Sequence, residues 1–511
     1  MKAKSFILIS LILLSFSSQI KAQYGHADNV VLSNVTSGTY YRYFFSFDSI
    51  APVLDTTITF NPTPNYTNDR FAVFSDKNGN LKLYSDGWRA WNGQHQPIDT
   101  TLYSPSTSVY RNVAVPMPDS PGLIYIFSIV HGTGDPTLNY SLINLNGNNG
   151  QGSVVHSGLL FSSHFPYWSE SLALTKHANG RDYWLVSKKY LTNEYVSFRI
   201  KPSGNVDTVF SQAGLVQNYD SPGYLKFSPN GKWLGDNIID QRHYNDTLQL
   251  LNFDASTGIV NDSNIRYVPC HLPFDGIGEP MEYAFSSNSR FVYVFHLHSY
   301  AKRFHQYDLA AQDQQSFFNS RTLIKQYNHS QAGSNKGIMG LTTNGKIYNP
   351  SGGYYTGMLH MNSIENPNSA GMSCNWQDYS YIIDPNFYYA SYSQFPLFCS
   401  SWLQEPVDFS YTHTCAGEDS PPTLFAFTDS VYQAEWHFGD SLAGGADTSS
   451  ALYPSYNYSH PGQYTVWVKA LHYGMWDSVT KTITIHQNPQ ISLGQDTTLS
   501  GNDTLVLDPG S

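Results

Sequence analysis

Charged side chains are scarce in this chain of 511 residues. They make up 13% of the sequence, against about 25% in ordinary soluble domains. The net charge of −11 is spread along the chain, and no run of Lys and Arg occurs. Binding to nucleic acid or to an anionic membrane surface needs such a basic cluster. We therefore expect neither as a partner.

Glutamate is also nearly absent, because only eight of the 39 acidic residues are Glu and the other 31 are Asp. Glu favours helices, whereas Asp favours turns and helix caps. The sequence has 38 Gly and 27 Pro to form turns, and aromatic residues, which favour strands, reach 15%. This composition predicts an all-β protein of short strands joined by turns, and the length predicts roughly three domains.

Long apolar runs are missing except at the N-terminus. Lys2 and Lys4 precede an apolar stretch over residues 6–16, and Ala22 offers a small residue for cleavage. The stretch is shorter than the ~20 residues that span a bilayer, and its flanks are typical of a signal peptide. We expect residues 1–22 to be removed, no transmembrane segment, and a secreted or cell-surface protein.

Cysteine is rare as well. The four residues permit two disulfides with three pairings, and the absence of a CxxC pair argues against a zinc site. They are Cys270, Cys374, Cys399 and Cys415. The preferred disulfide is Cys374–Cys399, and the alternative is that the cysteines are free buried thiols.

A turn followed by a β-forming segment recurs through the first 400 residues, as in FSPNGKWLGDNII and FSSNSRFVYVF. The copies lie 43 to 58 residues apart, near the 40–50 residues of a four-stranded propeller blade. The turn positions are Gly79, Gly122, Gly180, Gly231, Ser289 and Gly345.

Six copies, with a further blade closed by residues 40–47 and 387–403, predict a seven-bladed β-propeller over residues 23–404. Closure of this kind removes free sheet edges. A stack of ordinary sandwiches is the alternative, but it does not explain the repeated turn-and-strand phrase.

Residues 435–466 read EWHFGDSLAGGADTSSALYPSYNYSHPGQYTV. This stretch closely resembles the PKD domain, a small immunoglobulin-like β-sandwich of extracellular proteins. The resemblance implies that Trp436 and Tyr464 are core residues and that Gly439 and Asp440 turn the chain. The other members of the motif are Phe438, Tyr458, Pro461 and Gly462.

The resemblance places a PKD domain over residues 405–487, where it would act as a spacer. Residues 488–511 look like the start of a further immunoglobulin-like domain, and we expect that domain to be truncated. A terminal hairpin packed on the PKD domain is the alternative.

The wider chain is similar to a family of large secreted proteins of gliding bacteria. FAVFSDKNGNLKLYSDG, YLKFSPNGKWL and IENPNSAGMSCNW carry this resemblance. In that family a propeller region precedes PKD repeats, and many members end in a type IX secretion sorting domain. The resemblance implies export by that secretion machinery.

Motifs that carry chemistry are not found. No GxSxG elbow, HExxH helix or P-loop is present, so we expect no catalytic residues and no cofactor. His296 and His298 would share one face of a strand, where they are weak metal candidates that fit a structural or exposed pair better. Asp440 is expected to hydrogen-bond its own turn, and a calcium ion at this loop stays open as an alternative.

Three classes of function stay open. The leading one is a non-enzymatic binding or adhesion protein, whose propeller binds an extracellular glycan or protein while the PKD domain spaces it from the cell. The second is a secreted hydrolase or lyase, with catalysis in the propeller channel or in a domain beyond Ser511. The third is a structural component of the cell-surface matrix.

Overall fold

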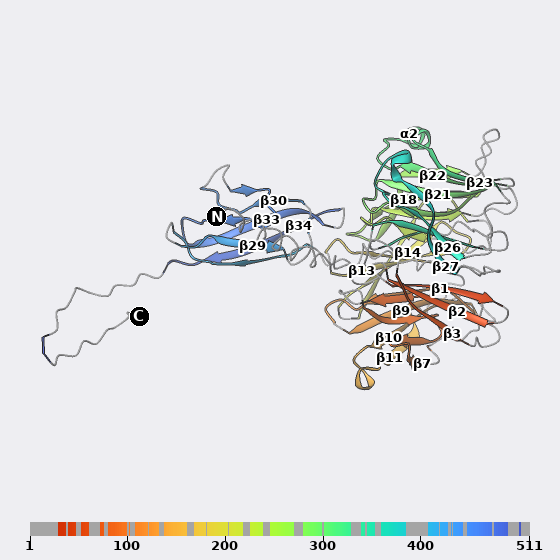
Figure 1. Ribbon diagram of the computed structural model, residues 1–511, viewed down its shortest axis with the longest axis horizontal. Helices are drawn as coiled ribbons and strands as arrows, with labels where there is room; N and C mark the ends of the chain where they lie inside the picture. The colour runs from red at the N-terminus through yellow and green to blue at the C-terminus, as the bar shows by residue number, and fades with distance from the viewer. Residues whose placement is uncertain are drawn as a thin grey trace, which may run out of the picture. The chain divides into compact units, whose positions relative to one another are not determined.

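The protein divides into two compact units, Met1–Gln404 and Glu405–Ser511, which are treated separately here (Figure 1). A computed structural model describes residues 29–36, 39–46, 53–60, 72–75, 80–99, 102, 108–120, 122–131, 137–160, 168–179, 181–202, 204–217, 225–238, 246–269, 279–298, 301–328, 339–342, 345–352, 359–384, 407–417, 420–427, 431, 433–442, 447–472, 475–488 and 500–501.

Seven antiparallel sheets make up the described part of the first unit, and in each the strands follow chain order. Sheet 1 contains β1 (Asn29–Thr36), β2 (Thr39–Ser46) and β3 (Val53–Phe60). Sheet 2 contains β4 (Ala72–Ser75), β5 (Leu81–Ser85), β6 (Ala90–Asn92) and β7 (Pro97–Asp99). Sheet 3 contains β8 (Ser108–Pro116), β9 (Leu123–His131), β10 (Thr137–Asn144) and β11 (Ser153–Leu159).

The next four sheets repeat the same four-stranded meander. Sheet 4 contains β12 (Trp168–Lys176), β13 (Tyr183–Lys189), β14 (Glu194–Ile200) and β15 (Val206–Gln212). Sheet 5 contains β16 (Leu225–Phe227), β17 (Trp233–Ile238), β18 (Thr247–Asp254) and β19 (Ile259–Pro269). Sheet 6 contains β20 (Glu279–Phe285), β21 (Phe291–His298), β22 (Ala301–Asp308) and β23 (Thr322–Asn328). Sheet 7 contains β24 (Gly340–Leu341), β25 (Ile347–Gly352), β26 (Leu359–Ile364) and β27 (Trp376–Asp384).

Helices are few and short in the described residues. They are η1 (Asn148–Gly150), α2 (Gln314–Asn319) and η2 (Gly371–Cys374). The all-β prediction is therefore confirmed.

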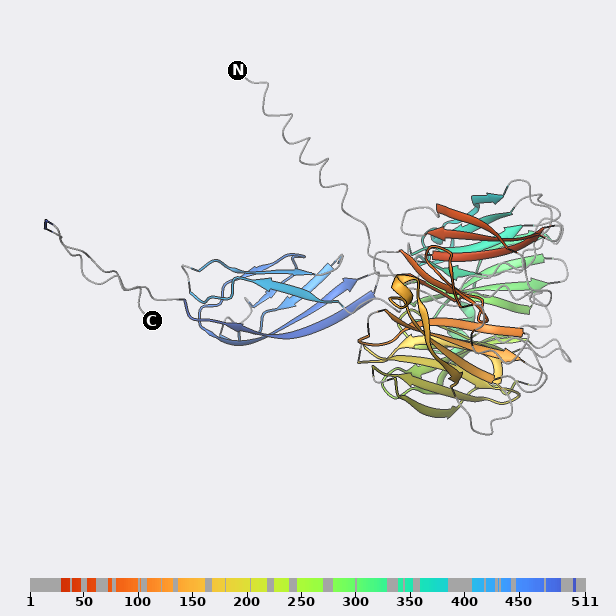
Figure 2. The ribbon, with the colours of Figure 1, turned by 90° about the horizontal axis from the view of Figure 1, so that it is seen from below.

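The sheets of the first unit pack against one another in succession. The first strands of neighbouring sheets are in contact, as for β4 with β8, β8 with β12, and β12 with β16. Buried aromatic and aliphatic side chains fill the spaces between sheets, and one such cluster joins sheets 3, 4 and 5 through Phe127, Trp184 and Phe253. In both views sheet 1, in red, lies beside sheet 7, in teal (Figures 1 and 2).

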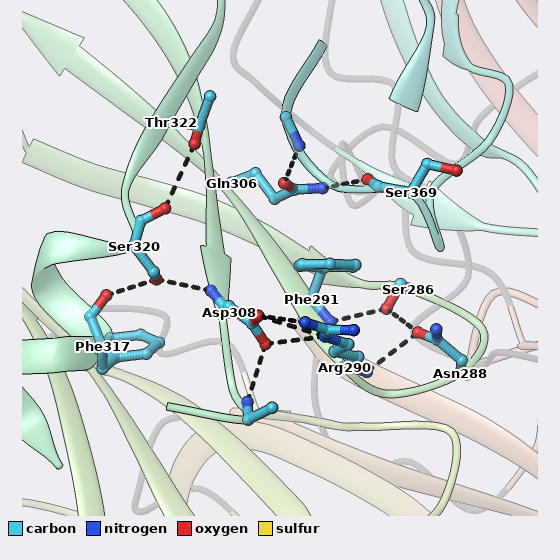
Figure 3. Close-up of polar contacts among 12 residues, drawn as sticks. Ser286, Asn288, Arg290, Phe291, Gln306, Asp308, Phe317, Ser320, Thr322 and Ser369 are labelled. Carbon is cyan, nitrogen blue, oxygen red and sulfur yellow. Dashed lines mark hydrogen bonds and ion pairs between the residues drawn. The ribbon is translucent and has the colours of Figure 1, made fainter. Parts of the chain in front are cut away.

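The recurring turn has a common hydrogen-bond pattern. In sheet 6 the Ser286 hydroxyl donates to Asn288 Oδ1 at 2.7 Å and accepts from the backbone N–H of Phe291 at 2.8 Å (Figure 3). Ser228 and Asn230 do the same in sheet 5. Serine and asparagine at this spacing satisfy backbone groups that no strand partner reaches, which explains why the phrase recurs in the sequence.

The second unit pairs two sheets around one core. Sheet 8 contains β28 (Phe409–Thr412), β29 (Thr423–Phe427) and β32 (Ser455–Tyr456). Sheet 9 contains β31 (Thr448–Ser449), β30 (Gln433–His437), β33 (Gly462–His472) and β34 (Met475–Ile485). Along β30 buried and exposed residues alternate, as expected for a sheet with one face on a core.

Several sequence predictions fall wholly or largely outside the described residues. These are the signal peptide, the closing segment 387–403, and nearly all of residues 488–511. The other closing segment, 40–47, coincides almost entirely with β2, the middle strand of sheet 1. Within the described ranges, no helix is long and apolar enough to cross a membrane.

Candidate functional site

The tryptophan of the 435–466 motif lies at the centre of the second unit's core. Trp436 is 1% exposed, and its ring packs against Phe409 and Phe425 at centroid distances of 5.2 and 5.5 Å. Its indole N–H donates to the carbonyl of Ala451 at 3.0 Å. The side chain thus buries a large apolar surface while its polar atom stays hydrogen-bonded.

The two tyrosines of the motif, Tyr458 and Tyr464, are buried to different extents. Tyr458 is 1% exposed, and its hydroxyl donates to the carbonyl of Phe438 at 2.9 Å. Tyr464 is only partly buried, with its hydroxyl on the carbonyl of His460. The side chain of Tyr464 lies on the same face of β33 as that of the buried Val466, but nearer the start of the strand. Tyr458 is thus the fully buried tyrosine of this core, and Tyr464 packs against the core with its ring 4.2 Å from that of Tyr458.

Gly439 and Asp440 form the turn after β30. Gly439 has φ of 75°, and a Cβ there would lie 2.3 Å from the carbonyl oxygen of Thr465, so only glycine fits. Asp440 accepts from the N–H of Leu442 and from the hydroxyl of Tyr456, both at 3.2 Å. Burial, together with the Asp440 charge, raises the pKa of Tyr456 to about 12. These contacts assign Asp440 to the turn. The exposed Pro461 and Gly462 lead into β33.

The two histidines proposed as weak metal candidates do not form a described pair. His296 is fully buried, and its ring lies 4.9 Å from that of His305 on the neighbouring strand β22. The Tyr307 hydroxyl lies 3.4 Å from His296 Nε2. The side chain of His298 is outside the described residues. Across the residues that the structure describes, no three His, Cys, Asp or Glu side chains gather as a metal site would require.

The predicted disulfide is not present. Cys374 is a free thiol at the end of η2, 0% exposed and packed in the core between sheets 6 and 7. It contacts the hydroxyl of Tyr293, and burial raises the pKa of the thiol. Cys399 lies outside the described residues. The expected pairing is corrected to the alternative of a free buried thiol, because the side chain of Cys374 points into an apolar core.

A buried ionic network that the sequence did not reveal joins sheets 4 and 5. Lys188 Nζ lies 2.8 Å from Asp236 Oδ2, and the Tyr195 hydroxyl donates to the same oxygen at 2.5 Å. Gln249 donates to it as well, at 2.9 Å. Burial, and then the Asp236 charge, raises the pKa of Tyr195 well above its ordinary value. The lysine and aspartate side chains are only 1% and 2% exposed, so the network holds sheets together rather than presenting a surface.

A second ionic group lies between the outer strands of sheets 6 and 7 and reaches solvent. We call Lys325, Tyr327, Trp376 and Asp378 the Asp378 cluster. The Trp376 indole N–H donates to Asp378 Oδ1 at 2.8 Å, the Tyr327 hydroxyl donates to the same oxygen, and Lys325 Nζ donates to Oδ2. The Lys325 and Asp378 side chains are 29% and 31% exposed. This cluster is therefore a partly solvent-accessible charged group with a defined geometry, formed by one strand of sheet 6 and one of sheet 7.

The Asp378 carboxylate stays ionised at neutral pH. Burial by itself raises the pKa of Asp378, but the hydrogen bonds from Lys325, Tyr327 and Trp376 together lower it below its ordinary value. Burial, and then the neighbouring Asp378, raises the pKa of Tyr327 well above its usual range, so this phenol remains a donor. The cluster thus presents a fixed negative oxygen beside an ammonium group.

Directly after the cluster, the backbone of β27 bulges at Tyr379. Asp378, Tyr379 and Ser380 together oppose the single residue Asn362 of β26. Tyr379 has φ of 53°, a left-handed conformation that is uncommon for a residue with a Cβ. Its N–H donates to Asn362 Oδ1 at 3.1 Å, and its ring lies 4.2 Å from the buried ring of His360. The Tyr379 side chain is nevertheless 48% exposed.

Sequence reasoning missed this whole region, although part of its signal was present. Alternation along WQDYSYIID would place Trp376 and Asp378 on one face of a strand. Their partners Lys325 and Tyr327 are more than 50 residues away in sequence. Nothing in the sequence marks Tyr379 as a bulged residue, since glycine or asparagine is the usual sign of a left-handed position.

The sequence of the chain matches no protein-family model and no curated protein. Among solved structures, the periplasmic gluconolactonase of Pseudomonas aeruginosa is 11% identical, with a TM-score of 0.43 over 72% of this chain and 98% of that one. A protein from Lactobacillus plantarum is 12% identical, with a TM-score of 0.41 and coverages of 71% and 96%. A hypothetical selenium-binding protein from Sulfolobus tokodaii is 10% identical, with a TM-score of 0.40 and coverages of 71% and 92%. All three TM-scores are below 0.5, so these likenesses carry no argument about this chain.

Proposed function

We propose that this chain is an exported, non-enzymatic binding protein. In this proposal the first unit is a seven-bladed β-propeller that carries the ligand site, and the second unit is a PKD-type spacer. Residues 1–22 are a signal peptide that is removed on export through a type IX machinery. The ligand is an extracellular glycan or protein.

The sheet pattern of the first unit supports the propeller. Six four-stranded meanders follow one three-stranded sheet, and first strands of neighbouring sheets are in contact at β1–β4, β4–β8, β8–β12, β12–β16 and β20–β24. Sheet 1 and sheet 7 lie side by side in both views (Figures 1 and 2). A ring of seven blades closed by the N-terminal sheet is the architecture that fits these contacts.

The packing of the second unit supports the PKD-type assignment. Trp436 fills the space between sheets 8 and 9, and Gly439 makes a turn that no other residue could make. On the surface of this unit Lys481 forms an ion pair with Asp408. A well-packed core of this kind suits a domain that acts as a spacer.

The observation that carries the binding proposal is the exposed, strained Tyr379 beside the Asp378 cluster. Left-handed backbone at a residue with a Cβ costs about 1–2 kcal/mol, and such strain gathers at functional positions. Tyr379 is 48% exposed there, whereas a core position would bury it. Binding of a ligand is a function that would retain such a side chain at this position.

Binding and turnover measured on the same preparation test the proposal. The purified chain, produced without residues 1–22, is applied to a glycan array and to a panel of extracellular proteins, and is then incubated with each ligand found. We expect saturable binding and no degradation of the ligand. Degradation would instead indicate the hydrolase or lyase class, and absence of both binding and degradation would indicate a matrix component.

A further inference from the structure

We infer that the surface formed by Tyr379, Asp378 and Lys325 binds a pyranose ring of a neutral glycan. We call these three residues the Tyr379 ledge. The inference rests on the proposed binding function and adds to it a site and a class of ligand.

The ring of Tyr379 provides an apolar platform. One side of the ring is held by His360, at a centroid distance of 4.2 Å and an interplanar angle of 32°. His360 is itself only 3% exposed, so it holds the tyrosine from within the protein. The 48% of Tyr379 that is exposed is then available to the C–H face of a sugar ring.

Hydrogen-bonding groups with spare capacity lie close to this platform, because Asp378 and Tyr379 share one bulge and the Tyr379 hydroxyl acts electrostatically on Tyr327, which donates to Asp378. A carboxylate oxygen accepts two hydrogen bonds, and an ammonium group donates three. Among the described residues, Asp378 Oδ2 accepts from Lys325 alone, while Oδ1 accepts from both Tyr327 and Trp376. One acceptor position on Asp378 and two N–H groups of Lys325 are therefore left for the hydroxyl groups of a ligand.

The charges of the ledge favour a neutral ligand. Lys325 and Asp378 form an ion pair, so their opposite charges cancel over the distance of a bound sugar. An acidic or a basic sugar would therefore gain no net attraction from the pair, and it would still lose hydration of its own charge on binding. Paired donors and acceptors beside an aromatic face match the alternating hydroxyl and C–H groups of a neutral pyranose.

A peptide strand fits the same surface less well. β27 is the outer strand of sheet 7, and an added strand would need its free backbone groups in regular register. The bulge at residues 378–380 interrupts that register, which is one way in which edge strands resist pairing. A ligand at this surface must therefore be bound by protein side chains, which is how proteins bind a pyranose ring.

Substitutions of Tyr379 in the whole exported chain test the site. Y379G removes the ring and also relieves the left-handed backbone, so it should keep or raise Tm. Y379F keeps the ring, and Y453A removes a tyrosine that is 70% exposed in the second unit as a matched control. Binding is measured by calorimetry with cellohexaose, chitohexaose and laminarihexaose. We expect Y379G to weaken binding at least about tenfold, and Y379F and Y453A to change it less than about threefold.

The outcomes separate the site from the function. Oligosaccharide binding that is unchanged in a folded Y379G overturns the ledge and leaves the proposed function intact. Wild-type binding to an immobilised peptide library, abolished in Y379G, with no oligosaccharide bound, overturns the glycan assignment alone. If the wild-type chain binds none of the oligosaccharides, glycans, proteins or peptides tested, the ledge and the proposed function are both wrong.

Discussion

At the scale of single residues, the partly exposed Asp378 carboxylate of the first unit is held in place by hydrogen bonds. The Asp378 carboxylate accepts from an ammonium and a phenol on β23 of sheet 6 and from an indole on its own strand β27. The contrast with Asp236 is informative, because that aspartate has a similar set of donors but is fully buried. Similar chemistry thus serves to join sheets at one position and to face solvent at the other.

The lowered pKa of Asp378 makes the stability of the first unit depend on acid pH. A carboxyl whose pKa is lower in the folded than in the unfolded state stabilises the fold at pH values above its ordinary pKa of 3.8. That stabilisation is lost as the pH falls through the pKa of the carboxyl in the folded state. We expect D378N to lower the free energy of unfolding by about 1 kcal/mol at pH 7. Below pH 4 the difference from the wild type should shrink.

Urea unfolding at pH 7 and pH 3 measures this difference. D207N is the matched control, because Asp207 pairs with Lys201 on the surface and is 53% exposed. Its effect should be small at both pH values. An effect of D378N that stays the same size at pH 3 would contradict the role given to the ionised carboxylate.

At the scale of elements, the repeated turn sets where each second strand begins. Gly231 in sheet 5 and Gly345 in sheet 7 occupy corresponding turns, with φ of 68° and 77°. Ser289 takes the same place in sheet 6 with φ of 59°. Its hydroxyl accepts from the backbone N–H of Asn230 at 2.9 Å, so that the turns of two sheets are joined. Gln306 makes a similar connection to Ser369 of the next sheet (Figure 3).

The two glycines give a paired test of this element. An added Cβ at Gly345 meets nothing within 4 Å, whereas at Gly231 it would lie 2.6 Å from Thr175 Oγ1. We expect G345A to lower the free energy of unfolding by about 1–2 kcal/mol, because alanine is strained in left-handed backbone. G231A should cost more, because Thr175 must also move. Urea unfolding compares them, and equal losses would show that the contact with Thr175 has no energetic weight.

At the scale of the whole molecule, the division at residues 404 and 405 separates two cores. The core cluster centred on Trp436 consists of described residues of the second unit. The described core clusters of the first unit pass from one of its sheets to the next. Each unit should therefore unfold in its own transition.

Calorimetry of a tryptophan variant tests this independence. W436A should destabilise the second unit by about 3–5 kcal/mol, since it removes the largest side chain of that core. The transition of the first unit should keep its temperature. W467A is the control, because Trp467 lies on the outer face of sheet 9, where it contacts the exposed His437. A shift of both transitions in W436A would mean that the units are coupled.

Much of the architecture was readable from the sequence, because it depends on local chemistry. Scarce Glu and frequent Asp, Gly and aromatic residues are enough to predict strands and turns. The serine and asparagine of the repeated phrase bond to backbone groups within five residues, so the turn forms wherever the phrase occurs. The resemblance to the PKD domain implied that Trp436 is a core residue, and the structure buries it, with 1% exposed.

The candidate site depended on tertiary structure instead. Asp378 meets Lys325 and Tyr327 only when sheet 7 packs on sheet 6, and no local pattern encodes that meeting. The same holds for His296, whose ring contacts His305 on another strand, and for Cys374, which faces an apolar core rather than a second thiol. Sequence alone determined which segments are strands and turns, because short-range hydrogen bonds and side-chain shape decide those. Only the packing of neighbouring sheets decided which of their polar side chains share a surface, because those contacts depend on the register between strands. A single bulge at Tyr379, for example, is enough to turn the ring of that residue toward solvent.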